Sequence, residues 1–229
     1  MASAPTTLSQ NQALMHEMLH LLSQPLTTLH CALEHSLTQD AAERAGEVAL
    51  ALEQTDRVIA AVRLMREYLE AEEGCFVAPP FPLGLATENV LEQLSVLAEA
   101  RGAHLFAAGT STAAIPVRNA WLQRALFYLL GALIEGCSAG QAITILLEDA
   151  GSSSVISGHN LPASDAPDDP PPPASKPAPD SNTLWQVKLE IARRVLESSG
   201  ASVELYSGAK PGFIIRLPHR RAPSQEIPV

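Results

Sequence analysis

The residue with the clearest potential for chemistry is His20, which lies five residues before Pro25 in a segment of helical periodicity. An imidazole can act as a nucleophile and carry a phosphoryl group near neutral pH. Proline lacks an amide hydrogen and its ring clashes with the carbonyl four residues earlier, so Pro25 should kink the helix just after His20. A held, reachable histidine beside a helix distortion is suited to phosphoryl transfer.

The segment around His20 has the apolar spacing of a helix in a left-handed bundle. The apolar residues recur at alternating intervals of four and three, and they are Met15, Leu19, Leu22, Leu26, Leu29 and Leu33. His20 directly follows Leu19 and so lies at the flank of this seam, where we expect it to be partly exposed. The periodicity predicts a first helix from about Gln10 to Leu37, preceded by a flexible N-terminus over residues 1–9.

A second helix is predicted directly after the first. Asp40 and Glu43 have the spacing of a capping box at its start. The helix extends to about Glu73 and carries a second apolar stripe, at Val48, Leu52, Ile59, Val62 and Leu69. Two antiparallel helices with one such stripe each cannot bury both stripes fully. We therefore expect this hairpin, residues 10–75, to form a homodimeric four-helix bundle.

A second domain is predicted over residues 83–218, between a proline-containing linker (76–82) and a tail (219–229). Asn119 is expected to cap one of its helices. The patterns predict helices at 85–100, 120–136 and 184–199, and strands at 104–107, 142–147, 153–157, 203–206 and 213–217. This order predicts an α/β sandwich with helices on one sheet face, so the whole chain is α+β. The loop 161–182 is of low complexity and buries too little apolar surface to order itself.

Composition and charge exclude several classes of function. The net charge is −10 over 229 residues, so nucleic acid is not an expected partner. The most apolar segment, 125–134, is too short to span a bilayer, and residues 1–10 lack the pattern of a secretory signal. Cys31, Cys75 and Cys137 are widely separated and form no metal-binding motif. We therefore expect reduced thiols, no bound metal, no membrane insertion and a cytoplasmic location.

The segment at residues 20–26, HLLSQPL, resembles the phospho-acceptor box of the histidine kinases of two-component signalling, which typically reads His-Glu-Leu-Arg/Asn-Thr/Gln-Pro-Leu. The matching residues are His20, Gln24, Pro25 and Leu26. Leu21 and Ser23 depart from the box, and Leu21 stands where the family usually has a carboxylate. The resemblance implies a dimeric hairpin with His20 as the phospho-acceptor. It also implies that response-regulator receiver domains dock below His20, around Leu21, Gln24 and Thr28.

The second domain resembles the ATP-binding domain of the same family. Together with the hairpin, the likeness to this family extends over about residues 12–218. Supporting segments are 117–126, 191–205 and 212–218. The family's N box usually reads Asn-Leu-Leu-x-Asn-Ala, and its asparagines serve phosphate and Mg²⁺. Here the box reads YLLGAL, so Tyr128 and Ala132 occupy the asparagine positions. An alanine has no oxygen to offer a hard cation, which implies a lost metal ligand.

The two glycine boxes of that family are also altered. The G1 box usually reads Asp-x-Gly-x-Gly, and here it reads ISGHN, with Ile156 in place of the adenine-binding aspartate and only Gly158 retained. The G2 box usually reads Gly-Leu-Gly-Leu, and here it reads QVKL. Gln186 and Lys188 replace glycines that let the backbone approach phosphates closely. We therefore expect weak or absent binding of ATP and Mg²⁺, and no cofactor.

The favoured hypothesis is a histidine phosphotransferase that relays phosphate between response-regulator receivers through His20. The receivers would supply Mg²⁺, and an upstream hybrid kinase is a further possible partner. One alternative is a divergent ATP-dependent sensor histidine kinase. Another is a non-catalytic, kinase-like dimeric regulator that sequesters a receiver or a kinase, which Leu21 favours because a carboxylate is missing beside His20. For His20 itself, an ordinary surface histidine is the alternative reading.

Overall fold

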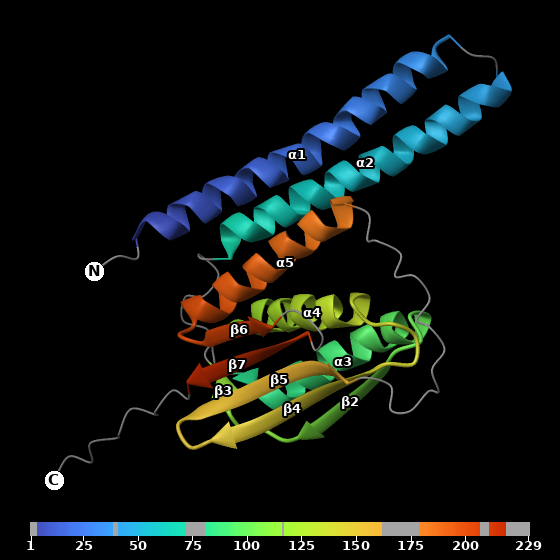
Figure 1. Ribbon diagram of the computed structural model, residues 1–229. Helices are drawn as coiled ribbons and strands as arrows, with labels where there is room; N and C mark the ends of the chain where they lie inside the picture. The colour runs from blue at the N-terminus through green and yellow to red at the C-terminus, as the bar shows by residue number, and fades with distance from the viewer. Residues whose placement is uncertain are drawn as a thin grey trace, which may run out of the picture. The chain divides into compact units, whose positions relative to one another are not determined.

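The computed structural model describes residues 4–38, 41–71, 81–115, 117–161, 179–206 and 211–218 (Figure 1). These residues form two compact units. One unit contains the two N-terminal helices and the part of a later helix that ends at Lys188. The other contains the strands, two further helices and the rest of that later helix from Leu189. Asp40, Cys75 and the predicted helix end at Glu73 lie outside the described residues.

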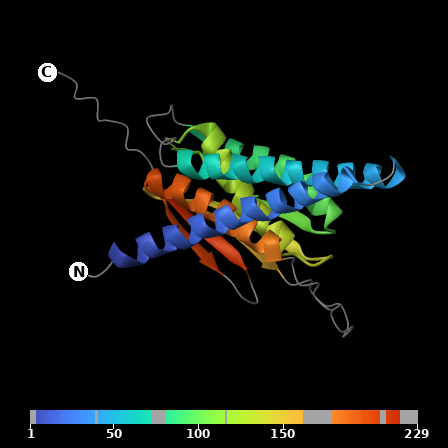
Figure 2. The same ribbon diagram turned by 90° about the horizontal axis from the view of Figure 1, so that it is seen from above.

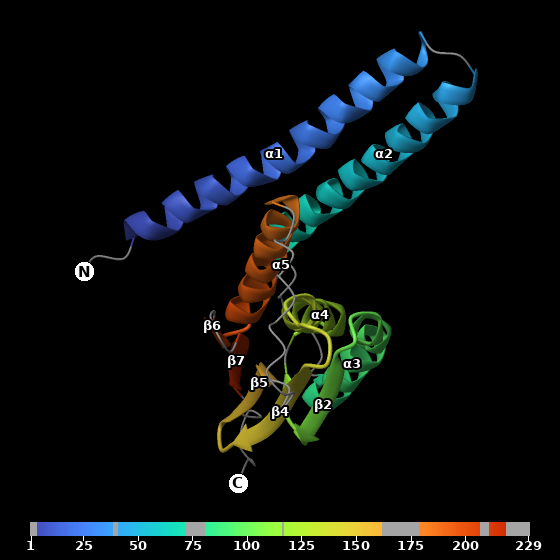
Figure 3. The same cartoon turned by 45° about the vertical axis from the view of Figure 1, so that its right-hand side comes forward.

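The N-terminal helices form an antiparallel hairpin, in which α1 comprises Ala4–Ser36 and α2 comprises Ala41–Glu70 (Figures 1 and 3). The α1 helix begins six residues before the predicted start at Gln10, so residues 4–9 are helical where a flexible segment is predicted. It continues as an α-helix through Pro25, whose ring is buried. The expected helical hairpin is therefore present, with a longer first helix.

The residues that the hairpin buries are not those of the predicted leucine seam. On α1 the buried side chains include Met18, Pro25 and Ala32, spaced seven residues apart, and Ser36, and on α2 they include Ala51, Gln54, Ala61 and Leu64. A second set of large apolar side chains remains exposed, and we call it the apolar stripe. Its members are Met15, Leu19, Leu26 and Leu33 on α1 and Val48, Leu52, Ile59, Val62 and Leu69 on α2. The exposed fraction reaches 54% for Leu19 and 63% for Leu52.

The second unit, which we call the α/β domain, is built on a five-stranded sheet with the order β2-β4-β5-β7-β6. Its strands are β2 (His104–Gly109), β4 (Ala142–Ala150), β5 (Ser153–Leu161), β6 (Ser202–Tyr206) and β7 (Gly212–Pro218). The β2–β4 pair is parallel and the other pairs are antiparallel. A small antiparallel pair joins β1 (Phe81–Pro82) to β3 (Ala114–Ile115). The fold is therefore α+β, a helical hairpin followed by an α/β sandwich.

Helices cover one face of this sheet (Figures 1 and 2). They are α3 (Leu83–Ala100), α4 (Asn119–Glu135) and the second half of α5 (Pro179–Ser198). Strand residues alternate between the two faces, and the helix-facing set on β4 and β7 is fully apolar. This set consists of Ile143, Ile145, Leu147, Phe213, Ile215 and Leu217, all buried. Each buried side chain of this size stabilises the fold by about 1.5–3 kcal/mol.

Several predicted boundaries differ from the structure. The pair β1–β3 is not predicted, and β1 lies inside the predicted linker 76–82. The ends of β5 and α5 fall inside the predicted loop 161–182, because β5 reaches Leu161 and α5 begins at Pro179. Asn119 is the first helical residue of α4 and does not cap it, since Arg118 is at the cap position and no side-chain cap bond forms. Short edge pairs and helix starts depend on tertiary contacts that a local pattern does not contain.

Candidate functional site

His20 lies exposed in the middle of α1, where its imidazole is accessible to another molecule. Among the described residues, none forms a hydrogen bond or ion pair with the His20 ring. Residues four and eight positions further share its side of an α-helix. The predicted docking residues at those positions, Gln24 and Thr28, are exposed, whereas Leu21 is half-buried. The structure thus brings Gln24 and Thr28 onto one accessible face with His20.

The backbone below His20 has an unusual set of side-chain hydrogen bonds. Pro25 cannot donate an amide hydrogen to the carbonyl of Leu21. Around this turn, three hydroxyls donate to carbonyls four residues earlier: Ser23 to Leu19 at 2.8 Å, Thr27 to Ser23 at 2.8 Å, and Thr28 to Gln24 at 3.2 Å. Such bonds slightly weaken and often bend a helix. The kink at Pro25 remains a prediction, and the hydroxyl bonds add a second physical reason for it.

The other α1 histidines whose partners are known lie towards the end of the helix and pair with glutamates. His30 Nδ1 lies 3.5 Å from Glu34 Oε2, and His35 Nδ1 lies 3.3 Å from Glu47 Oε1. The second pair joins α1 to α2. His16, one turn before His20, is also exposed. Of these histidines, only His20 has the spacing to Pro25 that the phospho-acceptor box requires.

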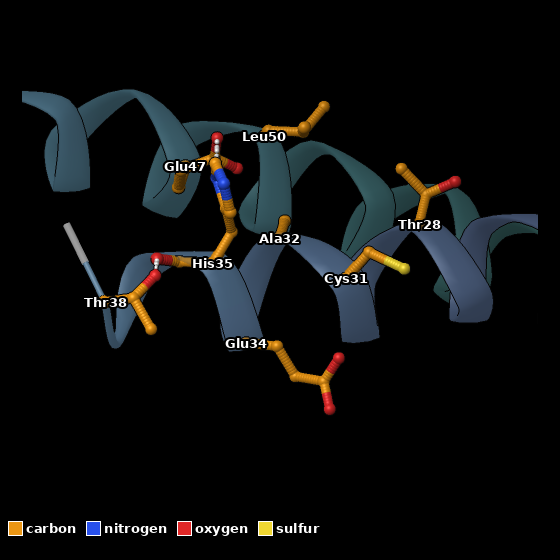
Figure 4. A pocket seen from close by; sticks show the side chains of 8 residues that line it. All are labelled: Thr28, Cys31, Ala32, Glu34, His35, Thr38, Glu47 and Leu50. Atoms are coloured by element: carbon orange, nitrogen blue, oxygen red, sulfur yellow. Dashed lines mark hydrogen bonds and ion pairs between the residues drawn. The ribbon is translucent and has the colours of Figure 1, made fainter.

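A cleft of about 470 Å³ lies between the two helices on the loop side of His20 (Figure 4). We call it the cleft, and it is lined by Thr28, Cys31, Ala32, Glu34, His35, Thr38, Glu47 and Leu50. Cys31 is an exposed free thiol. Figure 4 shows the His35 and Glu47 side chains meeting across the two helices. The sequence analysis did not find this cleft, because only the pairing of α1 with α2 brings Glu47 and Leu50 beside His35.

The N-box and G1 positions of the α/β domain are occupied by packed side chains. Tyr128 is buried, and its ring contacts Phe127 edge to face at a centroid distance of 6.3 Å. Ile156 is 1% exposed. A methyl group at Gly158 would lie 2.7 Å from the Phe213 ring, so no further group fits there. These positions therefore offer core packing in place of polar ligands, and Ala132 beside them is half-buried without a polar group.

Asn160, the last residue of the G1 segment, has a structural task. Its side chain is buried and its Nδ2 donates to the carbonyl of Leu133, near the end of α4, at 3.5 Å. The last carbonyls of a helix have no amide partner within the helix, so this long bond helps to satisfy one of them. Within the described residues, Asn160 Oδ1 has no hydrogen-bond partner. Sequence reasoning treated this residue only as a lost glycine.

The two G2 positions lie on α5, in the part of this helix that belongs to the hairpin unit. Gln186 is exposed. The Lys188 ammonium lies 4.2 Å from the centroid of the Trp185 ring, the geometry of a cation–π contact. Lys188 is thereby engaged within its own helix. The side chains at both positions are larger than the glycines that a phosphate-binding loop needs.

Further along α5, an acid–base cluster stabilises the helix surface. Burial alone would raise the pKa of Glu190, but hydrogen bonds from Arg193 at 2.7 Å and Arg194 at 3.1 Å hold its pKa below the usual value. The same bond to Glu190 raises the pKa of Arg193. These residues pair with one another along one helix, so we assign them to stability and not to chemistry.

The described part of the chain contains neither a metal-binding cluster nor a membrane-spanning helix. No group of three or more His, Cys, Asp or Glu side chains there could hold a metal ion. None of the helices in those ranges combines the length and apolar character needed to cross a membrane. Among the described residues, His20 both is exposed and matches the phospho-acceptor pattern. We therefore take its ring as the candidate site of chemistry.

No protein-family model and no curated protein matches the sequence. Solved structures do match. The histidine kinase AdeS of Acinetobacter baumannii is 15% identical with a TM-score of 0.63, over 88% of this chain and 98% of that chain. Histidine kinase ThkA in complex with response regulator protein TrrA is 16% identical with a TM-score of 0.66, over 93% of this chain and 63% of that chain. Full-length ShkA in complex with AMPPNP is 16% identical with a TM-score of 0.57, over 92% and 46%. The chain therefore has the fold of the histidine kinases.

Proposed function

We propose that this protein is a histidine phosphotransferase of two-component signalling, which relays phosphate between response-regulator receiver domains through His20. The observation that carries the proposal is the contrast within one histidine kinase fold. His20 is exposed and reachable beside Pro25 in the hairpin. The positions that would bind ATP are filled by Tyr128, Ile156 and the ring of Phe213.

The proposed reaction needs no nucleotide. A neutral imidazole nitrogen of His20 attacks the phosphorus of a receiver aspartyl phosphate. A P–N bond forms, the P–O bond to the aspartate breaks, and the carboxylate leaves with the electron pair. The phosphorylated ring then carries a positive charge and loses the N–H proton of its other nitrogen to solvent or to the partner, and the reverse steps load a second receiver. Such transfer depends on positioning and on the Mg²⁺ of the receiver.

We further propose that the working form is a homodimer. The apolar stripe runs along both α1 and α2, with spacings of three, four or seven residues between successive members on each helix. Contiguous exposed apolar residues of this kind mark interaction surfaces, and a two-fold axis lets the same stripe cover itself. A second copy would complete a four-helix bundle. Because His20 lies about 100–120° around the helix from Leu19 and Leu26, the bundle would leave it accessible.

A second candidate function has one specific observation in its favour. Leu21 is half-buried and apolar, so it can neither accept the proton of His20 nor orient the ring. A loss of general-base help commonly slows a reaction by about 10²–10⁴-fold. This favours a non-catalytic dimeric regulator that binds a receiver or a kinase through the same hairpin. In that case receivers would bind while His20 stayed unphosphorylated.

Phosphate transfer from a panel of phosphorylated receiver domains of the same organism tests the proposal. We expect rapid, acid-labile labelling of the wild-type protein and none of His20→Ala, with His16→Ala as the matched control that keeps the label. Binding without label would support the regulator and contradict the relay.

A thermal melt with Mg-ATP at millimolar concentration distinguishes the proposed phosphotransferase from a divergent ATP-dependent kinase. We expect an unchanged melting temperature. A clear rise, together with labelling of His20 from ATP, would instead identify a divergent ATP-dependent kinase. We place the protein in the cytoplasm on the basis of its proposed receiver partners.

A further inference from the structure

The cleft and His20 lie on the same face of α1. Cys31 follows His20 by eleven residues, which is close to three full turns, and lies roughly 16 Å further along the axis. His35, on α1 at the loop end of the cleft, follows His20 by fifteen residues, which places it about 60° beyond four full turns. A specific protein interface covers about 800 Å² per partner, a patch roughly 30 Å across. A receiver whose aspartate reaches His20 therefore covers at least part of the cleft.

The cleft also stays open when a second copy covers the apolar stripe. The stripe residues Leu26 and Leu33 lie on the side of α1 that is more than about 120° from Cys31. A dimer formed through the stripe thus leaves the cleft facing solvent. Its occupant must come from a different molecule that docks on the His20 face.

The lining of the cleft defines the chemistry of that occupant. Glu47 supplies the carboxylate that lies between the two helices, whereas the Glu34 carboxylate pairs with His30 along α1. Ala32 and Leu50 provide an apolar surface. The Glu47 side chain is only 25% exposed, so its charge is less screened than that of a surface glutamate. A long side chain with an apolar stem and a positive end is complementary to both parts.

We propose that the cleft is a specificity pocket for a lysine or arginine side chain of the docked receiver domain. This inference rests on the proposed function. The partner's cation pairs with Glu47, and its aliphatic stem lies against Leu50. In this structure His35 Nδ1 lies 3.3 Å from Glu47 Oε1. The docking receiver displaces the His35 ring from that carboxylate. Receivers with an acidic side chain at the matching position are rejected, because like charges in an interface oppose binding.

The test uses the full-length protein and the receiver that labels it fastest. We expect Glu47→Lys to raise the Kd for this receiver, and to slow transfer at low concentration, by roughly tenfold or more, and Glu47→Gln by less. Glu99→Lys, which makes the same charge change on α3, serves as the control, with an effect below about twofold. Equal effects of Glu47→Lys and Glu99→Lys would overturn the pocket.

A second variant separates specificity from damage to the hairpin. His35→Ala removes the same bond between α1 and α2 as Glu47→Lys does, but leaves the carboxylate free for the partner. We expect His35→Ala to bind the receiver as well as the wild-type protein or more tightly. If His35→Ala binds as weakly as Glu47→Lys, the loss comes from the hairpin and the inference is wrong.

The exposed thiol of Cys31 provides an independent readout. We expect saturating receiver to slow alkylation of Cys31 by a maleimide, measured by peptide mass spectrometry, with Cys137 as the internal reference. An unprotected Cys31 in a complex that still transfers phosphate would contradict the pocket and leave the proposed function standing. A wild-type protein that no receiver labels would contradict the proposed function itself.

Discussion

In the hairpin the group suited to chemistry lies in solvent, whereas in the α/β domain the corresponding positions lie in the core. His20 is exposed on α1, beside a cleft with two carboxylates. Ile156 is instead buried, and a methyl group added at Gly158 would meet the ring of Phe213, on the helix-covered face of the sheet. A histidine kinase fold can therefore keep its architecture while apolar side chains pack at these positions.

The largest expected effect concerns the surface that only the hairpin possesses. Leu19→Asp combined with Leu26→Asp should convert the proposed dimer to a monomer, since four leucines per dimer lose about 1.5–3 kcal/mol each. The dissociation constant should rise by roughly 10⁴-fold. Sedimentation equilibrium measures it. Val96→Asp, at a residue of α3 that is 72% exposed, should leave the dimer intact. A wild-type protein that sediments as a monomer would contradict the proposal that the apolar stripe of the hairpin is a dimer interface.

A carboxylate restored at the G1 position tests whether the α/β domain still has a hidden site. Ile156→Asp should destabilise the domain by about 3–5 kcal/mol, because it places an unpaired charge in the core. Ile156→Val should lower the unfolding free energy by only about 1 kcal/mol. Urea unfolding measures both changes. If the melting temperature of Ile156→Asp instead rises with Mg-ATP, the α/β domain retains an ATP site that lacks only this carboxylate. The contrast drawn between the hairpin and the α/β domain would then be wrong.

The same substitution in the two regions should have opposite signs. At Gly158 an added methyl group meets the Phe213 ring, and Gly158→Ala should destabilise by about 1–3 kcal/mol. At Gly46, on α2, nothing lies within 4 Å of the added methyl group. Gly46→Ala should therefore stabilise the hairpin by about 0.5–1 kcal/mol through helix propensity. Urea unfolding of both variants provides the measurement, and a stabilising Gly158→Ala would contradict the tight packing.

The smallest expected effect is the acid sensitivity of α5. The pKa of Glu190 is lower in the folded protein than its usual value of 4.5, so the unfolded chain binds a proton first as the pH falls. The stabilisation is complete above about pH 4.5 and is lost as the pH falls through the folded pKa. Glu190→Gln should be less stable than the wild type at pH 6, by under about 1 kcal/mol, and the difference should shrink at pH 3. A stability difference between Glu190→Gln and the wild type that is equally large at pH 6 and pH 3 would contradict this assignment.

The exposure of His20 and the fold class could both be predicted from local patterns. The heptad and the His20–Pro25 spacing are properties of one helix, and the alternation of strands and helices predicts the sandwich. The two packing faces of α1 could not be told apart in this way. The leucines form the more visible pattern, yet Met18, Pro25 and Ala32 are the residues that the hairpin buries. Small side chains and proline carry no strong periodic signal, although they permit close approach of two helices.

The cleft lay beyond prediction for a different reason. His35 and Glu47 are twelve residues apart and on different helices, so their contact depends on the register of α1 against α2. That register depends on packing and on the connecting turn. The altered boxes of the α/β domain are simpler, because a missing side-chain oxygen can be read directly from the residue type. The packing of Phe213 over Gly158 needed the sheet pairing.

The hydroxyl bonds around Pro25 have a mechanical consequence for α1. The turn between Leu19 and Thr28 lacks the amide donor of Pro25 and shares three of its carbonyls with serine and threonine side chains. Its bending stiffness should therefore be the lowest along the helix. A small bending moment, applied by a docked partner at either end of α1, will be relieved mainly at this turn. Under the proposed function, the imidazole of His20 can then tilt toward a reacting phosphorus while the rest of the hairpin keeps its shape.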